Sequence, residues 1–406
     1  MLRSKEVAII GAGKIGRGFL ADLFGRAGYH LIFINGSPKT IDKLNEQKKY
    51  TLFTTGPEGT TRTIISGYEA YSSQRDFDTV VKRLSEVDLA CVALYPNAYA
   101  NVADQLAGAV KKRRANGVEN PLNVLFFVNV VYPSRIFHEL MLERLTDPDD
   151  AAYFASHVGL VEALTFRGGY NPTPEMLAED PLCISSSPGE VLPVGDNFVG
   201  EKPSDIPSMQ FLDRMQGRLV RKVWCGNMGH CTQAAMGRKR GYTYIYECAR
   251  DQYIRKCTDY ASQEANFGVG REFGFTPEEM RESSRGRTWK DRQDSNSKDD
   301  VCRVAADPLR KLGHDDRYIG PALLCLKHGR MPYYLARGAA YLLFFQNEKD
   351  ASSVEMHRMI DALGIEKAIE TICGLDLQKP EENQLYQLVL AQYREILDHD
   401  VDPQTL

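Results

Sequence analysis

A lysine, an asparagine and a histidine lie close together in the second half of the chain, in the segment Lys222-Val-Trp-Cys-Gly-Asn227-Met-Gly-His230. Oxidation of an alcohol needs a base that takes the hydroxyl proton and donors that hold the oxygen as charge develops. A lysine that is desolvated in a cleft can have its pKa lowered toward neutrality and act as that base. Asn227 and His230 are three residues apart, so on a helix they share a face and can both donate to an alkoxide or carbonyl oxygen. Spacing alone leaves another interpretation open: a surface lysine, a capping asparagine and a core histidine.

A glycine-rich loop near the start of the chain predicts a site for a dinucleotide. It has the pattern G-x-G-x-x-G, follows a predicted strand that ends at Ile10, and opens a predicted helix over residues 14–24. In such a loop Gly11 permits a tight turn, Gly13 lets the backbone approach a pyrophosphate, and Gly16 lets helix and strand pack closely. Free N–H groups at the start of the helix can then bind the phosphates. The candidate cofactor-binding residues of the loop are Gly11, Gly13, Lys14, Ile15 and Gly16.

The residue that ends the second predicted strand bears on the choice between NAD and NADP. An acidic residue about 20 residues after the loop would hold the ribose hydroxyls of NAD. This chain has Asn35, followed closely by Ser37 and Lys39. An asparagine can still hydrogen-bond a ribose hydroxyl, but it lacks the charge that repels a 2′-phosphate, and Ser37 and Lys39 could bind one. NAD is the expected cofactor, and NADP is left open.

The elements that carry these residues predict an α/β fold. Four continuous apolar runs in the first 130 residues are typical of strands buried on both faces of a parallel sheet. They are Lys5–Ile10, Leu31–Ile34, Leu89–Leu94 and Leu122–Val128. Helical stretches at Gly16–Gly28 and Tyr99–Lys112 lie between them, so the pattern predicts an N-terminal, Rossmann-type, doubly wound parallel sheet.

The second half of the chain has a different character. After about Ser208 long segments have helical spacing, which predicts a mostly helical C-terminal domain. The stretch from about Gly168 to Pro207 is rich in Pro, Gly, Ser and Asp and is predicted to be irregular connecting structure. We therefore expect a dinucleotide-binding domain at 1–205 and a substrate-binding, catalytic domain at 206–406.

Composition excludes several classes of protein. Lys and Arg number 50 against 54 Asp and Glu in 406 residues, so a formal charge of −4 gives no basic field for nucleic acid. No apolar run approaches the roughly 20 residues that span a bilayer, and the N-terminal apolar run is too short for a signal peptide, so a cytoplasmic protein is expected. The nine cysteines include no C-x-x-C pair, and Cys225, His230 and Cys231 form an incomplete ligand set, so no metal site is predicted.

Several motifs along the chain match those of one known family. The densest match is KDDVCRVAADPLRKLGHDDR at Lys298–Arg317, and the segment K-x4-N-x2-H also matches. Further matches are GAGKIGRGF at Gly11–Phe19, NPLN at Asn120–Asn123, HVG at His157–Gly159 and GLD at Gly374–Asp376. With these motifs the sequence resembles the polyol-specific long-chain dehydrogenases of the mannitol dehydrogenase family over nearly its whole length. The residues around Pro308–Leu312 favour the branch that uses phosphorylated polyols.

This resemblance implies a reaction and roles for particular residues. The family is zinc-independent, and its phosphate-using branch interconverts mannitol 1-phosphate and fructose 6-phosphate with NAD. By the resemblance, Lys222 is the general base, Asn227 and Asn129 hold the reacting oxygen, and His230 helps to orient the substrate. Asn129 directly follows the predicted strand Leu122–Val128, and ligands bind at the carboxyl ends of such strands.

Three positions depart from the family pattern. Asn35 and Val128 stand where an acidic residue is usual, and Phe166 precedes Arg167 where Asp-Arg is usual. These departures leave two alternatives: a related reductase for a hexuronate or another sugar phosphate, and a nucleotide-binding regulatory protein that has lost catalysis. Such a regulator would have no need of Lys222, which favours an enzyme with a small polyol or sugar-phosphate substrate.

Cationic residues in the densest matching segment could bind a substrate phosphate. A guanidinium group binds phosphate oxygens through two parallel hydrogen bonds, and Arg303 and Arg310 are the candidate substrate-binding residues. The alternative is that these arginines form structural ion pairs with nearby carboxylates. Those carboxylates are Asp299, Asp300, Asp307, Asp315 and Asp316.

Overall fold

The structure is a computed structural model, which describes residues 5–165, 167–283, 289–293 and 299–399. Contacts divide the chain into two compact units, Met1–Gln216 and Gly217–Leu406. The domain boundary expected after residue 205 lies within the first of these units. The two units are described separately below.

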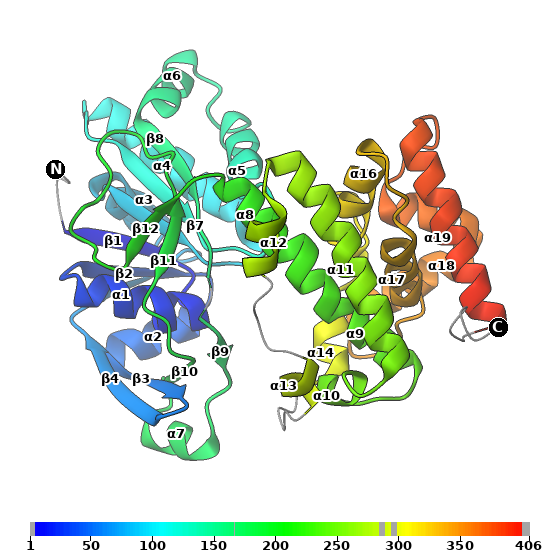
Figure 1. Ribbon diagram of the computed structural model, residues 1–406. Helices are drawn as coiled ribbons and strands as arrows, with labels where there is room; N and C mark the ends of the chain where they lie inside the picture. The colour runs from blue at the N-terminus through cyan, green and yellow to red at the C-terminus, as the bar shows by residue number, and fades with distance from the viewer. Residues whose placement is uncertain (1–4, 166, 284–288, 294–298, 400–406) are drawn as a thin grey trace. The chain divides into compact units, whose positions relative to one another are not determined.

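The first unit is built on a six-stranded sheet in which every neighbouring pair of strands is parallel (Figure 1). The strands are β1 (Glu6–Ile10), β2 (His30–Asn35), β5 (Glu69–Ser72), β6 (Leu89–Val92), β7 (Leu122–Phe126) and β8 (Val158–Glu162). Their order across the sheet is β5-β2-β1-β6-β7-β8, so the chain winds outward from β1 in both directions. This is the order of a Rossmann fold, and the predicted fold class is confirmed.

Helices cover both faces of this sheet, which explains the continuous apolar runs. Side chains at alternate strand positions enter two separate hydrophobic clusters, as Ile9 and Ile10 show for β1. Ile9 packs with η1 (Gly16–Leu20), α1 (Ala21–Arg26) and α2 (Pro38–Gln47). Ile10 packs on the other face, whose helices are α3 (Phe77–Glu86), α4 (Tyr99–Ala115), α5 (Pro133–Leu142) and α6 (Pro148–His157). A strand with both faces buried needs apolar residues at every position.

Part of the predicted connecting stretch Gly168–Pro207 is regular structure, so that expectation was wrong in part. The stretch contains β9 (Gly169–Tyr170), α7 (Pro174–Glu179), β10 (Ile184–Ser186) and β11 (Leu192–Gly195). Strands β9 and β10 complete a second sheet with β3 (Lys49–Gly56) and β4 (Gly59–Ser66), and β11 pairs with β12 (Met209–Leu212). Strands β9, β10 and β11 are only two, three and four residues long, so no periodic pattern marks them in the sequence.

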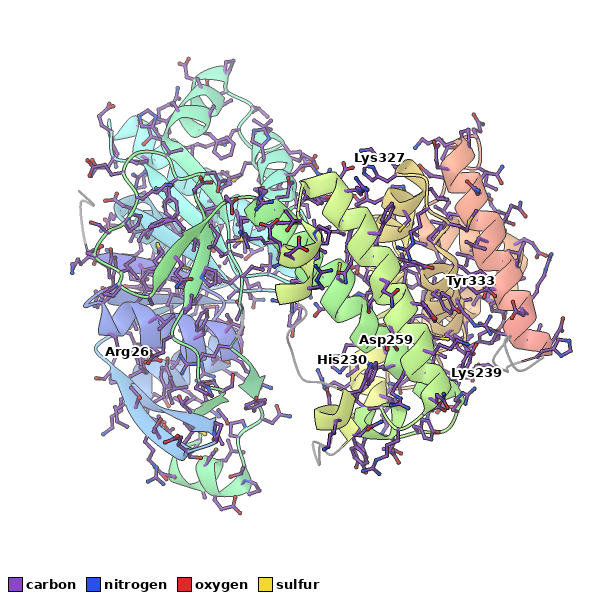
Figure 2. The ribbon with its side chains drawn as sticks, viewed as in Figure 1. Arg26, His230, Lys239, Asp259, Lys327 and Tyr333 are labelled. Carbon is purple, nitrogen blue, oxygen red and sulfur yellow. The ribbon has the colours of Figure 1, made fainter. Side chains whose placement is uncertain are left out.

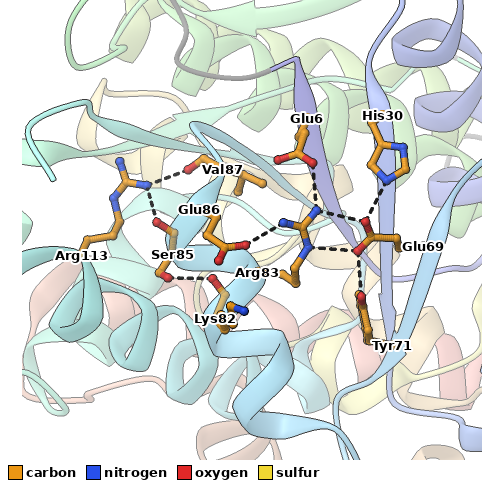
Figure 3. A network of polar contacts seen from close by, with 10 residues as sticks. All are labelled: Glu6, His30, Glu69, Tyr71, Lys82, Arg83, Ser85, Glu86, Val87 and Arg113. Atoms are coloured by element: carbon orange, nitrogen blue, oxygen red, sulfur yellow. Dashed lines mark hydrogen bonds and ion pairs between the residues drawn. The ribbon is translucent and has the colours of Figure 1, made fainter. Parts of the chain in front are cut away.

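Arg83 lies at the amino ends of three strands in the first unit and binds acidic side chains there (Figure 3). Glu6, His30 and Glu69 are the first residues of β1, β2 and β5, and their ligand-type atoms lie within 4.8 Å of one another. Arg83 donates to Glu6 at 2.9 Å and to Glu69 at 3.0 Å, and His30 lies 3.1 Å from Glu69. The guanidinium group therefore supplies the positive charge that these carboxylates need, at the edge of the sheet opposite the glycine-rich loop.

The second unit is helical, as predicted. A helix that begins with α8 (Met215–Arg221) continues through the π-type segment η3 (Lys222–Asn227) into α9 (Met228–Lys239). With α11 (Gln252–Phe273) and α17 (Tyr333–Leu343), α9 forms the centre of one large hydrophobic cluster. The remaining helices are α10 (Ile245–Cys248), α12 (Pro277–Ser283), α13 (Trp289–Gln293), α14 (Val301–Ala305), α15 (Pro308–Lys311), α16 (Ile319–Lys327), α18 (Ala351–Cys373) and α19 (Pro380–Asp398). Among the described residues, no helix is long and apolar enough to cross a membrane.

Candidate active site

The glycine-rich loop joins β1 to η1 at the carboxyl edge of the sheet. Gly11 has a φ of +115°, which favours glycine, and a Cβ at Gly11 would overlap the carbonyl oxygen of Ala93. A Cβ at Gly16 would overlap the carbonyl oxygen of Gly11, so turn and helix pack at the contact distance that only glycine permits. Beside Gly13 there is no atom within 4 Å of the Cβ position. The loop thus leaves open space where a pyrophosphate would approach, and its residues fit a dinucleotide.

A short segment from elsewhere in the chain packs on this loop. Lys14 donates from Nζ to Oδ1 of Asn171 at 2.6 Å, and a Cβ at Gly169 would lie 2.6 Å from the side chain of Lys14. Ile15 packs instead against the hydrophobic cluster that contains Ile9, on the face of the sheet covered by η1, α1 and α2. Sequence reasoning did not identify Asn171, because it lies 157 residues from its partner. The cationic group of Lys14 is held beside the loop by this contact.

Asn35 ends β2 at the same edge of the sheet. Its carbonyl oxygen accepts from the backbone N–H of Ser73 at 3.0 Å, and its side chain is partly buried. Ser37 caps α2 by accepting from the backbone N–H of Thr40 at 3.4 Å, while Lys39 is exposed. Of the two residues that could bind a 2′-phosphate, Ser37 therefore already caps a helix, and the side chain of Lys39 is exposed to solvent.

Lys222 begins the π-type segment in the middle of the long helix α8–η3–α9. Segments of this type have i→i+5 hydrogen bonds and occur often at functional sites. Lys222 is partly buried, and this burial lowers its pKa from the ordinary 10.5 to about 8. Two residues on, Trp224 is buried against Gly320, where a Cβ would overlap the indole ring. A lysine with such a pKa can release and take up a proton near neutral pH.

Asn227 and His230 lie farther along the same helix. In the structure Asn227 is not a capping residue, and His230 is not a core histidine. Asn227 is partly buried and makes no side-chain capping hydrogen bond to α9. His230, labelled in Figure 2, lies on α9. Its side chain is 41% exposed, and its Nε2 lies 3.2 Å from Oδ2 of Asp299. Because Lys222, Asn227 and His230 share one helix, the structure places three of the four predicted catalytic residues on a single element.

Asn129, the fourth predicted catalytic residue, belongs to the first unit. It follows β7 by three residues at the carboxyl edge of the sheet, next to the end of β8. Val128 does not face outward there: its side chain is buried in the hydrophobic cluster formed with α3, α4 and α5. Glu162, which sequence reasoning missed, ends β8 as a buried carboxyl group that accepts from Ser134 Oγ at 2.7 Å, and burial raises its pKa. An acidic residue at the end of an apolar strand is the signal that could have found it.

Arg167 forms a buried ion pair and hydrogen bonds within the first unit. Phe166 lies outside the described residues. Arg167 is buried and donates from Nη1 to Oδ2 of Asp22 on α1 at 2.7 Å. It also donates to the carbonyl oxygen of Ser187 at 2.9 Å and to Thr54 Oγ1 at 3.0 Å. These bonds fasten the start of the segment that packs on the glycine-rich loop.

Both candidate phosphate-binding arginines have carboxylate partners in the second unit. Arg303 donates from Nε to Oδ1 of Asp299 at 2.9 Å, and its Nη2 also contacts that oxygen. Arg310 donates to Asp307 and, from Nη1, to Asp316 at 3.1 Å. Asp299 therefore connects Arg303 with His230, while Arg310 belongs to a separate group of ion pairs.

Comparison with known proteins places this geometry in one family. The chain matches the mannitol dehydrogenase Rossmann domain over residues 5–184 and the mannitol dehydrogenase C-terminal domain over residues 218–371. The solved structure of Pseudomonas fluorescens mannitol 2-dehydrogenase in a ternary complex with NAD and D-mannitol is similar, with a TM-score of 0.78 and 16% identity, covering 97% of this chain and 92% of that one. Substrate-free D-sorbitol dehydrogenase has a TM-score of 0.69 and 15% identity, covering 97% and 93%. The predicted resemblance is confirmed: the chain belongs to the mannitol dehydrogenase family, a family of polyol oxidoreductases.

Proposed function

We propose that this protein is an NAD-linked dehydrogenase that interconverts a polyol and a ketose, with mannitol 1-phosphate and fructose 6-phosphate as the leading pair. The observation that carries the proposal is Lys222, a partly buried lysine on a π-type helical segment whose burial lowers its pKa to about 8. In this proposal the domain at 1–205 binds the dinucleotide, and the domain at 206–406 supplies the acid–base group.

The glycine-rich loop and Asn35 would hold the cofactor. The backbone around Gly13 would meet the pyrophosphate, and the side chain of Asn35 would hydrogen-bond a ribose hydroxyl. NAD, when bound, accepts a hydride from the carbon that is oxidised. The mannitol 2-dehydrogenase of similar fold was solved with NAD and D-mannitol, which supports a nicotinamide cofactor and a polyol substrate. The NAD in that complex also favours NAD over NADP as the cofactor.

Lys222 would carry the proton transfer. With a pKa of about 8, about a tenth of the Lys222 side chains are neutral amines at pH 7 and about half at pH 8. In oxidation the neutral Nζ takes the hydroxyl proton, and the amides of Asn227 and Asn129 donate to the oxygen as its charge grows. In reduction the Lys222 ammonium group donates its proton to the ketose oxygen.

Arg303 is the better of the two candidates for the substrate phosphate. Nε and Nη2 of Arg303 contact Asp299, but Nη1 makes no hydrogen bond to any described residue, and the side chain is 68% exposed. Arg310 also leaves one Nη group without a hydrogen bond to a described residue, but it bonds two carboxylates and its side chain is only 34% exposed. A phosphate can therefore reach Arg303 more readily than Arg310.

The test is a substrate and cofactor panel followed by reduced-nicotinamide absorbance. The protein is mixed with fructose 6-phosphate or free fructose, each with NADH and with NADPH. We expect the fastest oxidation with fructose 6-phosphate and NADH. No turnover with any of the four pairs would contradict the proposal.

The same assay tests the proposed phosphate contact. Arg303→Ala is expected to lower kcat/KM for fructose 6-phosphate about tenfold or more, the size of a lost charge-assisted hydrogen bond, and to affect free fructose less. Arg358→Ala is a matched control, because Arg358 is an exposed arginine paired with Glu355 within α18. An equal loss for both sugars in Arg303→Ala would rule out phosphate binding by this residue.

A further inference from the structure

A single carboxylate links two of the residues assigned to the substrate. Asp299 accepts from Arg303 on Oδ1, with Nε at 2.9 Å, and its Oδ2 lies 3.2 Å from Nε2 of His230. His230 belongs to α9, 69 residues earlier in the chain. The Asp299 side chain is 24% exposed, against 41% for His230 and 68% for Arg303. The carboxylate of Asp299 is therefore the most buried group of the three, and the two side chains that bind it are more exposed to solvent.

The neighbouring Asp300 shows that this contact is not needed to form the helix. Asp300 caps α14, because its Oδ1 accepts from the backbone N–H groups of Cys302 at 2.7 Å and Arg303 at 3.2 Å. The backbone is fixed separately, since the carbonyl oxygen of Asp299 accepts from the N–H of Ile245 at 2.9 Å. Two adjacent acidic residues thus have different tasks, and the side chain of Asp299 serves only His230 and Arg303 among the described residues.

The contact decides which atoms remain available on each partner. Burial acts to raise the pKa of Asp299, but the hydrogen bonds from His230 and Arg303 bring that pKa below its ordinary value, so the group is a carboxylate. A carboxylate only accepts, so the neutral His230 ring must carry its proton on Nε2 and present Nδ1 as an acceptor. No described residue bonds to Nδ1 of His230 or to Nη1 of Arg303.

We infer that Asp299 is a positioning residue for the substrate: it fixes His230 in the Nε2–H tautomer and directs Arg303, so that the pair presents one acceptor and a cationic donor side by side. The inference rests on the proposed function. A polyol phosphate offers the complementary groups, a hydroxyl that donates to His230 and a phosphate that accepts from Arg303.

The inference assigns the two groups to different ends of the substrate. His230 follows Lys222 by eight residues, so the two side chains leave the helix at separate points along its axis. In fructose 6-phosphate the carbonyl at C2 and the phosphate on C6 are four carbons apart. In this inference Lys222 acts at the reacting carbon, and the group centred on Asp299 meets the phosphorylated end of the same molecule.

The first experiment compares Asp299→Asn with the unchanged protein by steady-state kinetics. We expect kcat/KM for fructose 6-phosphate to fall at least tenfold, mainly through KM, while KM for NADH changes less than about twofold. The effect should depend on His230, so the loss in Asp299→Asn combined with His230→Gln should be smaller than the product of the two single losses. The control is Asp315→Asn, because Asp315 lies 3.0 Å from Nδ1 of His314, whose side chain is 40% exposed, much like that of His230.

The second experiment does not require activity. Nitrogen NMR of protein labelled at histidine, at about pH 8.5 where an ordinary imidazole is neutral, reports the tautomer of His230, with His230→Gln identifying its signals. We expect the Nε2–H form in the unchanged protein and in Asp300→Asn, and a shift toward Nδ1–H in Asp299→Asn.

The outcomes separate this inference from the proposed function. Turnover of fructose 6-phosphate with unaltered kinetics in Asp299→Asn would overturn the inference and leave the proposed function standing. An Nδ1–H tautomer in the unchanged protein would also overturn it. An Nε2–H tautomer that Asp299→Asn shifts, in a protein that turns over no ketose, would support the positioning contact and refute the proposed function.

Discussion

Replacing Lys222 with methionine should make the protein more stable and inactive. Burial holds the pKa of Lys222 at about 8 instead of 10.5. At roughly 1.4 kcal/mol per pH unit, this difference corresponds to about 3 kcal/mol that opposes folding while the ammonium group is charged. The side chain is only partly buried, so solvent screens part of this effect, and we expect Lys222→Met to raise the free energy of unfolding by about 1–3 kcal/mol at pH 7.

The pH dependence of that gain tests its cause. Because the folded chain has the lower pKa, the unfolded chain binds more protons between pH 8 and pH 10.5. The stability of the unchanged protein therefore rises through this window, and the advantage of Lys222→Met should shrink to nothing above it.

Urea unfolding at a series of pH values measures both quantities. Lys367→Met serves as the control, because Lys367 lies on the surface of α18, where its side chain is 58% exposed. A Lys222→Met protein that is less stable at pH 7, or whose advantage does not depend on pH, would refute this reasoning.

Two further substitutions test the first unit. Asn35→Asp restores a carboxylate that holds a ribose diol and repels a 2′-phosphate, so the ratio of kcat/KM for NADH to that for NADPH should rise about tenfold; a fall in that ratio would contradict the assignment of Asn35. Arg167→Met leaves Asp22 buried without its closest cation, so urea unfolding should show a loss of about 3 kcal/mol, whereas Arg26→Met, which removes a half-exposed partner of the same carboxylate, should cost less than about 1 kcal/mol. Equal losses in the two variants would show that the buried pair is not the stabilising contact.

The sheet could be predicted because its strands carry a local signal. A strand with two buried faces needs apolar residues at every position, and the run Leu122–Val128 duly contains β7. Strand β10 has only three residues, and its partner β3 lies about 130 residues earlier, so no local pattern could identify it. Short strands obtain their stability from pairing with distant segments, which composition does not reveal.

The candidate site also has a part that the sequence predicts and a part that only the structure shows. The glycine-rich loop and Lys222 are visible as motifs, since the chemistry requires particular residue types at fixed spacing. The link from His230 through Asp299 to Arg303 joins helices that are far apart in sequence, and only the folded chain brings it together. The π-type turn at Lys222 and the burial that shifts its pKa are likewise properties of packing.

The pH dependence of catalysis tests most directly whether Lys222 is the base. The measurement is kcat/KM for oxidation of mannitol 1-phosphate by NAD between about pH 6 and pH 10, for the unchanged protein and for Lys222→Ala. We expect the unchanged protein to gain about tenfold per pH unit up to a plateau above about pH 8, the pKa of Lys222. Lys222→Ala should lose roughly a thousandfold in kcat/KM and show no inflection there. A Lys222→Ala protein that keeps the same inflection and most of its activity would contradict the assignment of Lys222 as the base.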